Sequence, residues 1–267
     1  MAAPLLGGRV RHDQLATGHR TGIEPVLLAA SIPARPGERV LEGGTGSGAA
    51  LLCLAGRVSG IAGIGIERDP ALAALARTNI AANGFTALTV QEGDLAAARA
   101  DGTFDHAFAN PPWHAPAGTA SPDPRQETAR RGGVGLLALW AARLAAPLRH
   151  RGTLTFALAA ASLPEGLAAL TASGCGSPSV LPLWPRAGRP ARLLLLRGIK
   201  GGRGPCVLLP GLVLHRQGGG YTAEAEAILR AGAPLPFGDG QRAVSGRRDD
   251  TRGSASCRSP PPCDWTD

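Results

Sequence analysis

The chain has 267 residues, of which 44% are hydrophobic, enough for one α/β domain with short appendages. Its net charge of +8 favours a polyanionic partner, although an Arg-rich composition in which only Lys200 is lysine also arises from coding bias. Five scattered cysteines without a Cys-x-x-Cys pair argue against a zinc site or a disulfide framework. The sequence shows neither a signal peptide nor a membrane span, so we expect a metal-free cytoplasmic protein.

Predicted strands and helices alternate along most of the chain. The expected strands cover residues 39–41, 61–66, 88–90, 104–109, 153–159, 180–184 and 191–197, with a small hairpin formed by 207–209 and 212–215. The expected helices cover residues 26–31, 49–58, 71–83, 136–148, 163–173 and 221–231. This alternation predicts an α/β fold with a Rossmann-like, doubly wound and mostly parallel sheet that has helices on both faces.

The composition divides the chain into three parts. Residues 1–20 hold basic side chains among small residues and predict an irregular basic arm. Residues 21–237 carry the alternating pattern and form the domain. Residues 238–267 are rich in Arg, Asp, Ser and Pro and almost free of aliphatic side chains, so we expect a disordered tail.

The stretch from Phe104 to Trp113 is the motif around which we interpret the rest of the chain. A short apolar strand ends at Asn110 and is followed by Pro111 and Pro112, which cannot continue a central strand. Asn110 therefore lies at a strand end, where open α/β sheets bind their ligands. An amide oxygen, backbone carbonyls and the flat face of Trp113 together suit a planar group that bears an NH2. The alternative is a strand that ends in a proline turn beside an incidental tryptophan.

The glycine-rich loop after the first strand predicts a nucleoside site. Gly44, Gly46 and Gly48 are followed by a helix, an arrangement that lets the backbone approach a ligand closely. The loop also meets the loose dinucleotide pattern, and Glu67 at the end of the second strand suits the ribose of either cofactor. Asp94, after the third strand, either contacts the adenine amino group or caps a helix.

These motifs, in this order and spacing, resemble the class I methyltransferases that modify amino nitrogens and use S-adenosylmethionine. Within that class, the chain from about Arg9 to Ala231 resembles the bacterial tRNA(Val) adenine-N6-methyltransferases. Residues 19–28 resemble the segment before the family's first strand, and Asn110–Trp113 resembles its Asn-Pro-Pro-Tyr motif. Residues 191–196 and 221–225 resemble its closing strand and its late Tyr-Ser/Thr-x-Glu-Ala element.

The resemblance implies a seven-stranded class I fold and a set of site residues. It assigns the catalytic site to Asn110, Pro111, Pro112 and Trp113. It assigns the S-adenosylmethionine site to Thr21, Gly22, Glu42, Gly44, Gly46, Gly48, Glu67, Arg68, Asp94, Leu95 and Asn110. Glu42 stands where the family usually has Asp, and Trp113 replaces Tyr.

The expected substrate is adenine N6 in the anticodon loop of tRNA(Val), and we expect the protein to act as a monomer. The candidate phosphate contacts are Arg9, Arg11, Arg20, Arg125, Arg130 and Arg131. Solvated surface arginines are the alternative for this set. Methylation of a protein glutamine or of guanine N2 in rRNA uses the same amine chemistry, and a non-catalytic RNA-binding module or an NAD-dependent oxidoreductase would fit parts of the pattern.

Overall fold

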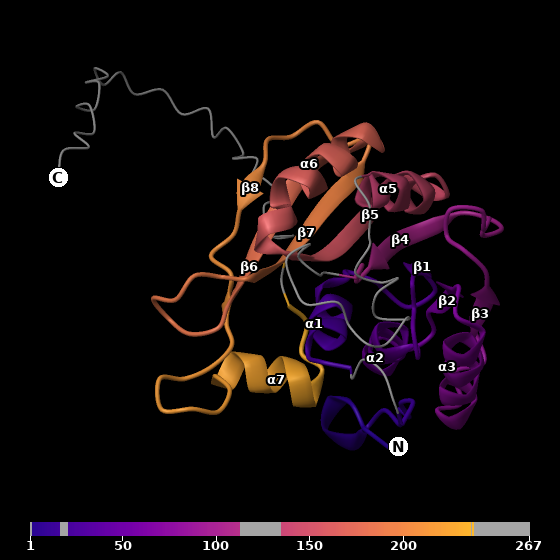
Figure 1. The fold of residues 1–267 in the computed structure, drawn as a ribbon, viewed down its shortest axis with the longest axis horizontal. Helices are drawn as coiled ribbons and strands as arrows, with labels where there is room; N and C mark the ends of the chain where they lie inside the picture. Colours follow the sequence, from indigo (N-terminus) through magenta and orange to yellow (C-terminus); the bar gives the residue numbers. More distant parts are fainter. Residues whose placement is uncertain (1, 17–20, 113–134, 236, 238–267) are drawn as a thin grey trace, which may run out of the picture. The chain divides into compact units, whose positions relative to one another are not determined.

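The computed structural model describes residues 2–16, 21–112, 135–235 and 237, whose helices and strands are arranged around a central sheet (Figure 1). The strands are β1 (Arg39–Gly43), β2 (Ala62–Glu67), β3 (Leu88–Glu92), β4 (Phe104–Ala109), β5 (Leu148–Ala159), β6 (Cys175–Trp184), β7 (Leu193–Lys200), β8 (Val207–Leu208) and β9 (Leu212–Val213). The helices are α1 (Glu24–Ser31), α2 (Ala49–Arg57), α3 (Pro70–Ala82), α5 (Leu136–Ala145), α6 (Leu163–Ala172) and α7 (Ala223–Ala231), with 3-10 turns η1 (Leu6–Gly8) and η2 (Ala160–Ser162). No helix in these ranges is long and apolar enough to cross a membrane.

The strands lie in the order β3-β2-β1-β4-β5-β7-β6-β8, and β9 also pairs with β6. Strands β1 to β5 are parallel, whereas β7 is antiparallel to β5 and β6. Seven longer strands in a mostly parallel sheet confirm the predicted fold class. The carboxyl ends of β1 to β5 gather on one side of the sheet, the carboxyl edge, and their beginnings form the amino edge.

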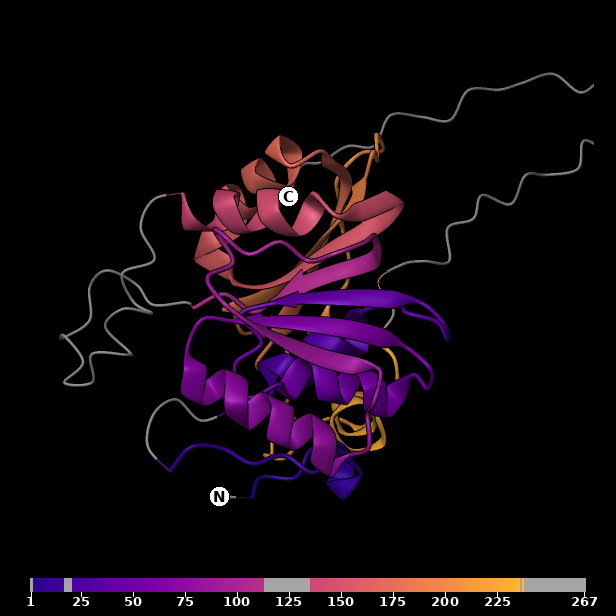
Figure 2. The same cartoon turned by 90° about the vertical axis from the view of Figure 1, so that its right-hand side faces the viewer.

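Helices cover both faces of the sheet (Figure 2), and a hydrophobic core lies on each face. On one face, Leu27 of α1 and Leu51 of α2 pack with Leu195 of β7. On the other face, Leu144 of α5 packs with Phe156 of β5. Because both faces are covered, the central strands are apolar on both sides, which explains their continuous hydrophobic runs.

Short polar residues and prolines set where several helices begin. Asp69 caps α3 by accepting from the backbone N–H groups of Ala71 and Leu72, and Pro70 occupies the first helical position. Thr222 caps α7 by accepting from the backbone N–H of Ala225. Helix α2 instead follows Gly48, whose φ of 90° is the left-handed conformation that glycine adopts readily.

The predicted hairpin at 207–215 is wrong. Strand β8 pairs in parallel with β6 at Ser179–Val180, and β9 pairs in parallel with β6 at Leu183–Trp184, so the chain does not reverse between them. The Trp184 indole N–H donates to the carbonyl of Pro210, 3.0 Å away, which holds this stretch along β6. Several predicted boundaries also differ: α5 ends at Ala145, β5 begins already at Leu148, and β6 begins at Cys175, five residues before the predicted strand.

The segment at residues 2–16 is anchored to the domain. Leu6 and Val10 are buried in the core beside α2, and η1 also packs against α7. The backbone of Arg11 exchanges two hydrogen bonds with the side-chain amide of Asn83 at the end of α3. The expected tail at residues 238–267 lies outside the described residues.

Candidate active site

The glycine loop joins the carboxyl end of β1 to the beginning of α2. Gly44, Gly46 and Gly48 have φ values of 65°, 58° and 90°, which L side chains rarely adopt. A methyl group added at Gly46 would meet no atom within 4 Å, so the space above this backbone is open. The loop therefore offers exposed backbone at the carboxyl edge, where a ligand can approach closely.

Trp140 of α5 covers the first glycine of this loop. A Cβ built on Gly44 would lie 2.7 Å from Cη2 of the indole, so only glycine fits there. The ring is half-buried. Sequence reasoning missed this contact because Trp140 carries no motif, and only the packing of α5 brings it to the loop.

Two carboxylates lie below and beside the loop. Glu42 of β1 is buried, and its Oε2 accepts a hydrogen bond from the Thr45 hydroxyl at 2.5 Å. Glu67 at the end of β2 accepts from the backbone N–H groups of Gly46 (2.8 Å) and Asp69 (2.9 Å). The second strand thus holds the loop in place through one side chain, while both carboxylates face the site without a cationic partner among the described residues.

Burial raises the pKa of Glu42 to about 8, above its ordinary value of 4.5, and the charge of Glu67 adds to the rise. The hydrogen bond from Thr45 opposes it but is the smaller effect. Glu42 is therefore mostly protonated at neutral pH, and a cationic ligand nearby would favour its ionised form.

Asn110 follows β4 directly beside the glycine loop. Strand β4 pairs in parallel with β1, and the register sets Ala109 opposite Gly43. Asn110 and Gly44 are therefore the next residues on two neighbouring strands that lie roughly 4.8 Å apart. Pro111 is buried and Pro112 is half-buried, whereas Trp113 lies outside the described residues. The predicted meeting of the amide with the glycine loop agrees with this register.

Asp94 and Leu95 follow β3, the third strand whose end reaches this edge. One oxygen of the Asp94 carboxylate accepts from the backbone N–H of Ala96 at 2.9 Å, which is a turn-capping contact without a regular helix behind it. Leu95 is buried, and its side chain reaches within 2.9 Å of a Cβ position on Gly43. Leu95 therefore forms part of the apolar floor under the loop.

Residues 2–16 also reach the glycine loop, which sequence reasoning missed. The ring Nε2 of His12 lies 2.8 Å from the Ser47 hydroxyl, and the Asn79 side-chain amide donates to the Ser47 carbonyl at 2.9 Å. Asn79 also exchanges two hydrogen bonds with the backbone of Asp13. Burial lowers the pKa of His12, so this ring is neutral and braces the loop through hydrogen bonds rather than charge.

The remaining predicted residues take separate positions. Thr21 and Gly22 precede α1, and the backbone N–H of Thr21 donates to the Gln14 side chain at 3.1 Å. Arg68 is exposed at the end of β2, beside Glu67. Arg9 and Arg11 are exposed on the amino-terminal segment. Four predicted phosphate contacts lie outside the described residues: Arg20, Arg125, Arg130 and Arg131.

The site fits S-adenosylmethionine in its donor set. The open face of Gly46 would let a ligand approach the backbone closely, and the Glu67 carboxylate lies at the end of β2 beside it. S-adenosylmethionine is cationic, and such a ligand would lie near the Glu67 carboxylate and would favour the ionised form of Glu42. No group of three or more metal-ligating side chains occurs in the described parts of the chain.

Comparisons with known proteins also find similarity to methyltransferases. Residues 22–123 match the family model "Methyltransferase small domain". A tRNA1(Val) (adenine(37)-N6)-methyltransferase from Erwinia tasmaniensis is 34% identical over 125 residues, covering 45% of this chain and 50% of that protein. The enzyme of the same name from Actinobacillus succinogenes is 33% identical over 155 residues, covering 57% of this chain and 64% of that protein. The matches therefore cover half of the first relative and less than two thirds of the second.

A solved structure of a predicted O-methyltransferase from Agrobacterium tumefaciens shares the fold. It superposes with a TM-score of 0.65 at 22% identity, covering 79% of this chain and 98% of that chain. The fold, the family match and the composition of the loop agree with one another. Residues 22–123 therefore resemble a methyltransferase small domain in sequence, and the described residues share the fold of this solved structure.

Proposed function

We propose that the chain is an N-methyltransferase that acts on an exocyclic amino group, most specifically adenine N6 of tRNA. One observation carries this proposal: the pairing of Ala109 with Gly43 sets Asn110 beside the glycine loop. An amide followed by Pro111 and Pro112 offers hydrogen-bond acceptors next to the cofactor loop. A hydroxyl or thiol substrate has no need of two such acceptors, whereas an NH2 group does.

The residues at the end of β4 would orient a poor nucleophile. The exocyclic nitrogen of adenine has its lone pair delocalised into the ring. If the Asn110 side-chain oxygen and the Pro111 carbonyl each accept an N–H bond, the nitrogen becomes pyramidal and its lone pair points toward the methyl group. The same oxygens stabilise the positive charge that develops on nitrogen.

S-adenosylmethionine supplies a methyl group that is already activated on a sulfonium. The nitrogen–carbon bond forms as the carbon–sulfur bond breaks, the bonding pair leaves with sulfur, and the methylated amine then loses a proton to water. Because no strong base is required, neutral Asn110 suffices. Alignment of the three atoms is most of the task for this chain, which agrees with a rigid glycine loop.

The choice of tRNA rests on the relatives and on charge. Both curated relatives are named for adenine 37 of tRNA1(Val), and the net charge of +8 suits a polyanion. A tRNA substrate would place the enzyme in the cytoplasm. The partial coverage of the relatives leaves the nucleotide to be established by experiment.

The test is methylation of unmodified tRNA by the purified chain with a labelled methyl donor, followed by nucleoside analysis by mass spectrometry. We expect label in N6-methyladenosine and none with Asn110→Ala. Parallel reactions with rRNA and with a recombinant release factor test the guanine N2 and protein glutamine alternatives. Label in either of these, with unlabelled tRNA, would replace adenine as the substrate.

A further inference from the structure

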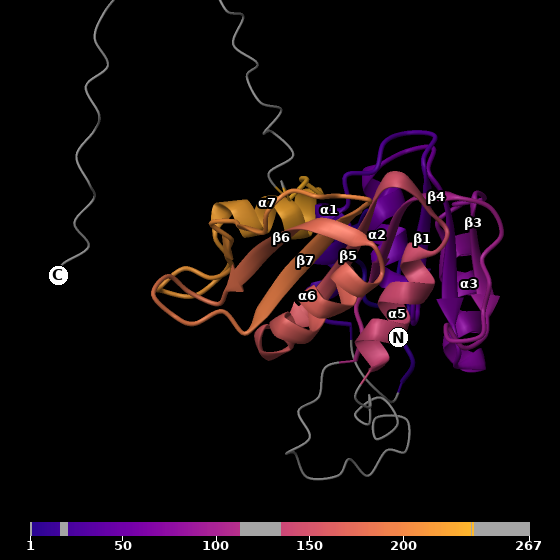
Figure 3. The ribbon, with the colours of Figure 1, turned by 90° about the horizontal axis from the view of Figure 1, so that it is seen from above.

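A loop from the far side of the sheet reaches the same edge as Asn110. Strand β6 runs parallel to β5, because both pair antiparallel with β7. Strand β6 therefore ends at the carboxyl edge, and residues 185–192, which join it to β7, project from that edge. Figure 3 shows this loop extending at the left of the view, beyond the ends of β6 and β7.

Four exposed arginines gather on this part of the edge. The loop carries three of them, and the fourth, Arg216, follows β9, which pairs in parallel with the last residues of β6. The backbone N–H of His215 donates to the Pro185 carbonyl at 3.1 Å, which joins the two segments. We call this surface the arginine edge: Arg186, Arg189, Arg192 and Arg216.

Among the described residues, the guanidinium groups of the arginine edge have no acidic partners. The ion pairs of the described residues involve other arginines, and the stretch from residue 166 to 223 contains no Asp or Glu at all. Uncompensated arginines on an exposed loop form a site for a polyanion.

Aromatic rings accompany these charges. Trp184, Arg189 and Pro190 line, with three neighbours, a hollow of about 430 Å³ at the base of the loop. The His215 and Tyr221 rings stack beside it with centroids 4.8 Å apart. Trp184, His215 and Tyr221 are half-buried. Arginines beside aromatic rings are a combination that binds single-stranded nucleic acid, since the charges bind phosphates and an accessible ring can stack on a base.

We propose that the arginine edge binds the phosphate backbone of the RNA substrate next to the nucleotide that enters the site. This inference rests on the proposed function, because it takes Asn110 as the position of the target base. Three strand spacings separate β4 from β6, or roughly 14 Å. That distance corresponds to about four nucleotides of a stacked strand at ~3.4 Å each. The contacted phosphates are therefore those of the same anticodon loop and stem.

The test compares two triple variants of the full chain. Arg186→Gln, Arg189→Gln and Arg192→Gln remove three charges from the arginine edge. The matched control removes three exposed charges elsewhere: Arg35→Gln before β1, Arg143→Gln near the end of α5 and Arg203→Gln after β7. Both proteins lose the same net charge, so a difference between them reports position. A third protein, with Arg186→Lys, Arg189→Lys and Arg192→Lys, keeps the charge.

Binding of an unmodified tRNA(Val) transcript is measured at several salt concentrations, together with S-adenosylmethionine binding. We expect the edge variant to bind RNA at least 10-fold more weakly, and its salt slope to fall by about 2, since each phosphate contact contributes about 0.7. The Lys protein should recover most of the RNA affinity, and cofactor affinity should not change. The control should stay within about 2-fold of wild type.

Equal losses in the edge and control variants would overturn the inference, since only net charge would then matter. Unchanged RNA binding in the edge variant would overturn it as well. These readouts do not require turnover. If tRNA binds through the arginine edge but is not methylated, the proposed function fails alone; if tRNA is methylated and the edge variant binds normally, this inference fails alone.

Discussion

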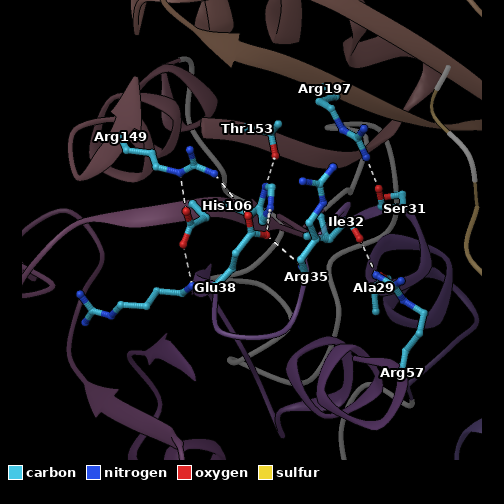
Figure 4. Close-up of polar contacts among 12 residues, drawn as sticks. Ala29, Ser31, Ile32, Arg35, Glu38, Arg57, His106, Arg149, Thr153 and Arg197 are labelled. Carbon is cyan, nitrogen blue, oxygen red and sulfur yellow. Dashed lines mark hydrogen bonds and ion pairs between the residues drawn. The ribbon is translucent and has the colours of Figure 1, made fainter. Parts of the chain in front are cut away.

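Buried or half-buried carboxylates lie at both edges of the sheet, but their hydrogen-bond and ion-pair partners differ between the two edges. At the amino edge, Glu38 contacts the His106 ring nitrogen at 3.0 Å and Arg149 at 3.3 Å, and Arg149 also pairs with Asp105 (Figure 4). At the carboxyl edge, Glu42 and Glu67 accept hydrogen bonds only from hydroxyl and backbone groups among the described residues. Paired charges at one edge support the fold, whereas the carboxylates at the other edge lack a cationic partner among the described residues and suit a cationic ligand.

At the amino edge, the ring nitrogens of His106 are already hydrogen-bonded within the protein. His106 is buried, with Nδ1 at 2.8 Å from the Thr153 hydroxyl and Nε2 on Glu38. Burial lowers the pKa of His106 and keeps the ring neutral, so Nε2–H donates to Glu38 and Nδ1 accepts from Thr153. Each polar atom of this ring already has a partner, which leaves none for a substrate.

The sharpest test of the contrast is Asn110→Ala at the carboxyl end of β4. We expect the single-turnover rate to fall by about 10²–10³-fold, because the developing charge on nitrogen loses an oriented acceptor. Cofactor affinity should change by less than about 3-fold. The measurement is rapid-quench methyl transfer alongside cofactor titration. A normal single-turnover rate would remove Asn110 from the mechanism.

The next largest effect is expected from Glu67→Gln. This substitution keeps the shape of the side chain but removes the charge that accepts from Gly46 and Asp69. Loss of charge-assisted hydrogen bonds of this kind costs about 1.5–3 kcal/mol, so cofactor affinity should fall by about 10–100-fold. Calorimetric titration measures it. A Kd equal to that of wild type would show that this carboxylate serves only to hold the loop.

Glu42→Gln tests whether the Glu42 carboxylate destabilises the folded state and strengthens cofactor binding. Between its ordinary pKa of 4.5 and its folded pKa of about 8, the folded state binds more protons than the unfolded state, so stability falls as pH rises through this range. The variant should therefore be more stable than wild type at pH 7, by about 1–3 kcal/mol.

Cofactor affinity should change with pH in the direction opposite to stability. Wild-type affinity should rise between pH 6 and pH 9, because ionised Glu42 attracts a cation, and the Gln variant should lose that dependence. Chemical denaturation and titration at each pH supply both quantities. A destabilised variant with an unchanged pH profile of binding would contradict the role given to Glu42.

The smallest effect is expected at the amino edge. Glu38→Gln leaves the shape in place but weakens the contacts with His106 and Arg149, so stability should fall by about 1 kcal/mol. Methyl transfer and cofactor affinity should stay at wild-type values. A loss of activity without a loss of stability would contradict our interpretation that the amino edge supports the fold and the carboxyl edge forms the site.

Local patterns predicted the parts of the site that are continuous in sequence. The strand, glycine loop and helix from Arg39 to Arg57 and the strand that stops at Asn110 depend on neighbouring residues, and both were predicted correctly. Their meeting in one register also agrees with the expected parallel sheet. The roles assigned to these side chains remain predictions.

The remaining features depend on contacts between segments far apart in sequence. His12 braces Ser47 only because residues 2–16 pack against α3, and nothing in the local sequence of an apparently irregular arm indicates that contact. The hairpin prediction failed for a similar reason. Two short apolar runs separated by Pro210 and Gly211 look like a turn, whereas the free side of β6 binds both runs in the same direction.

The position of Trp140 against Gly44 provides the enzyme with an optical probe of its own. A cofactor bound over this loop changes the surroundings of the indole, so intrinsic fluorescence follows binding without any label. Trp184 lies on β6, away from the loop, and Trp184→Phe lowers the background while leaving that signal intact. Rapid mixing monitored by tryptophan fluorescence can then time cofactor entry separately from methyl transfer.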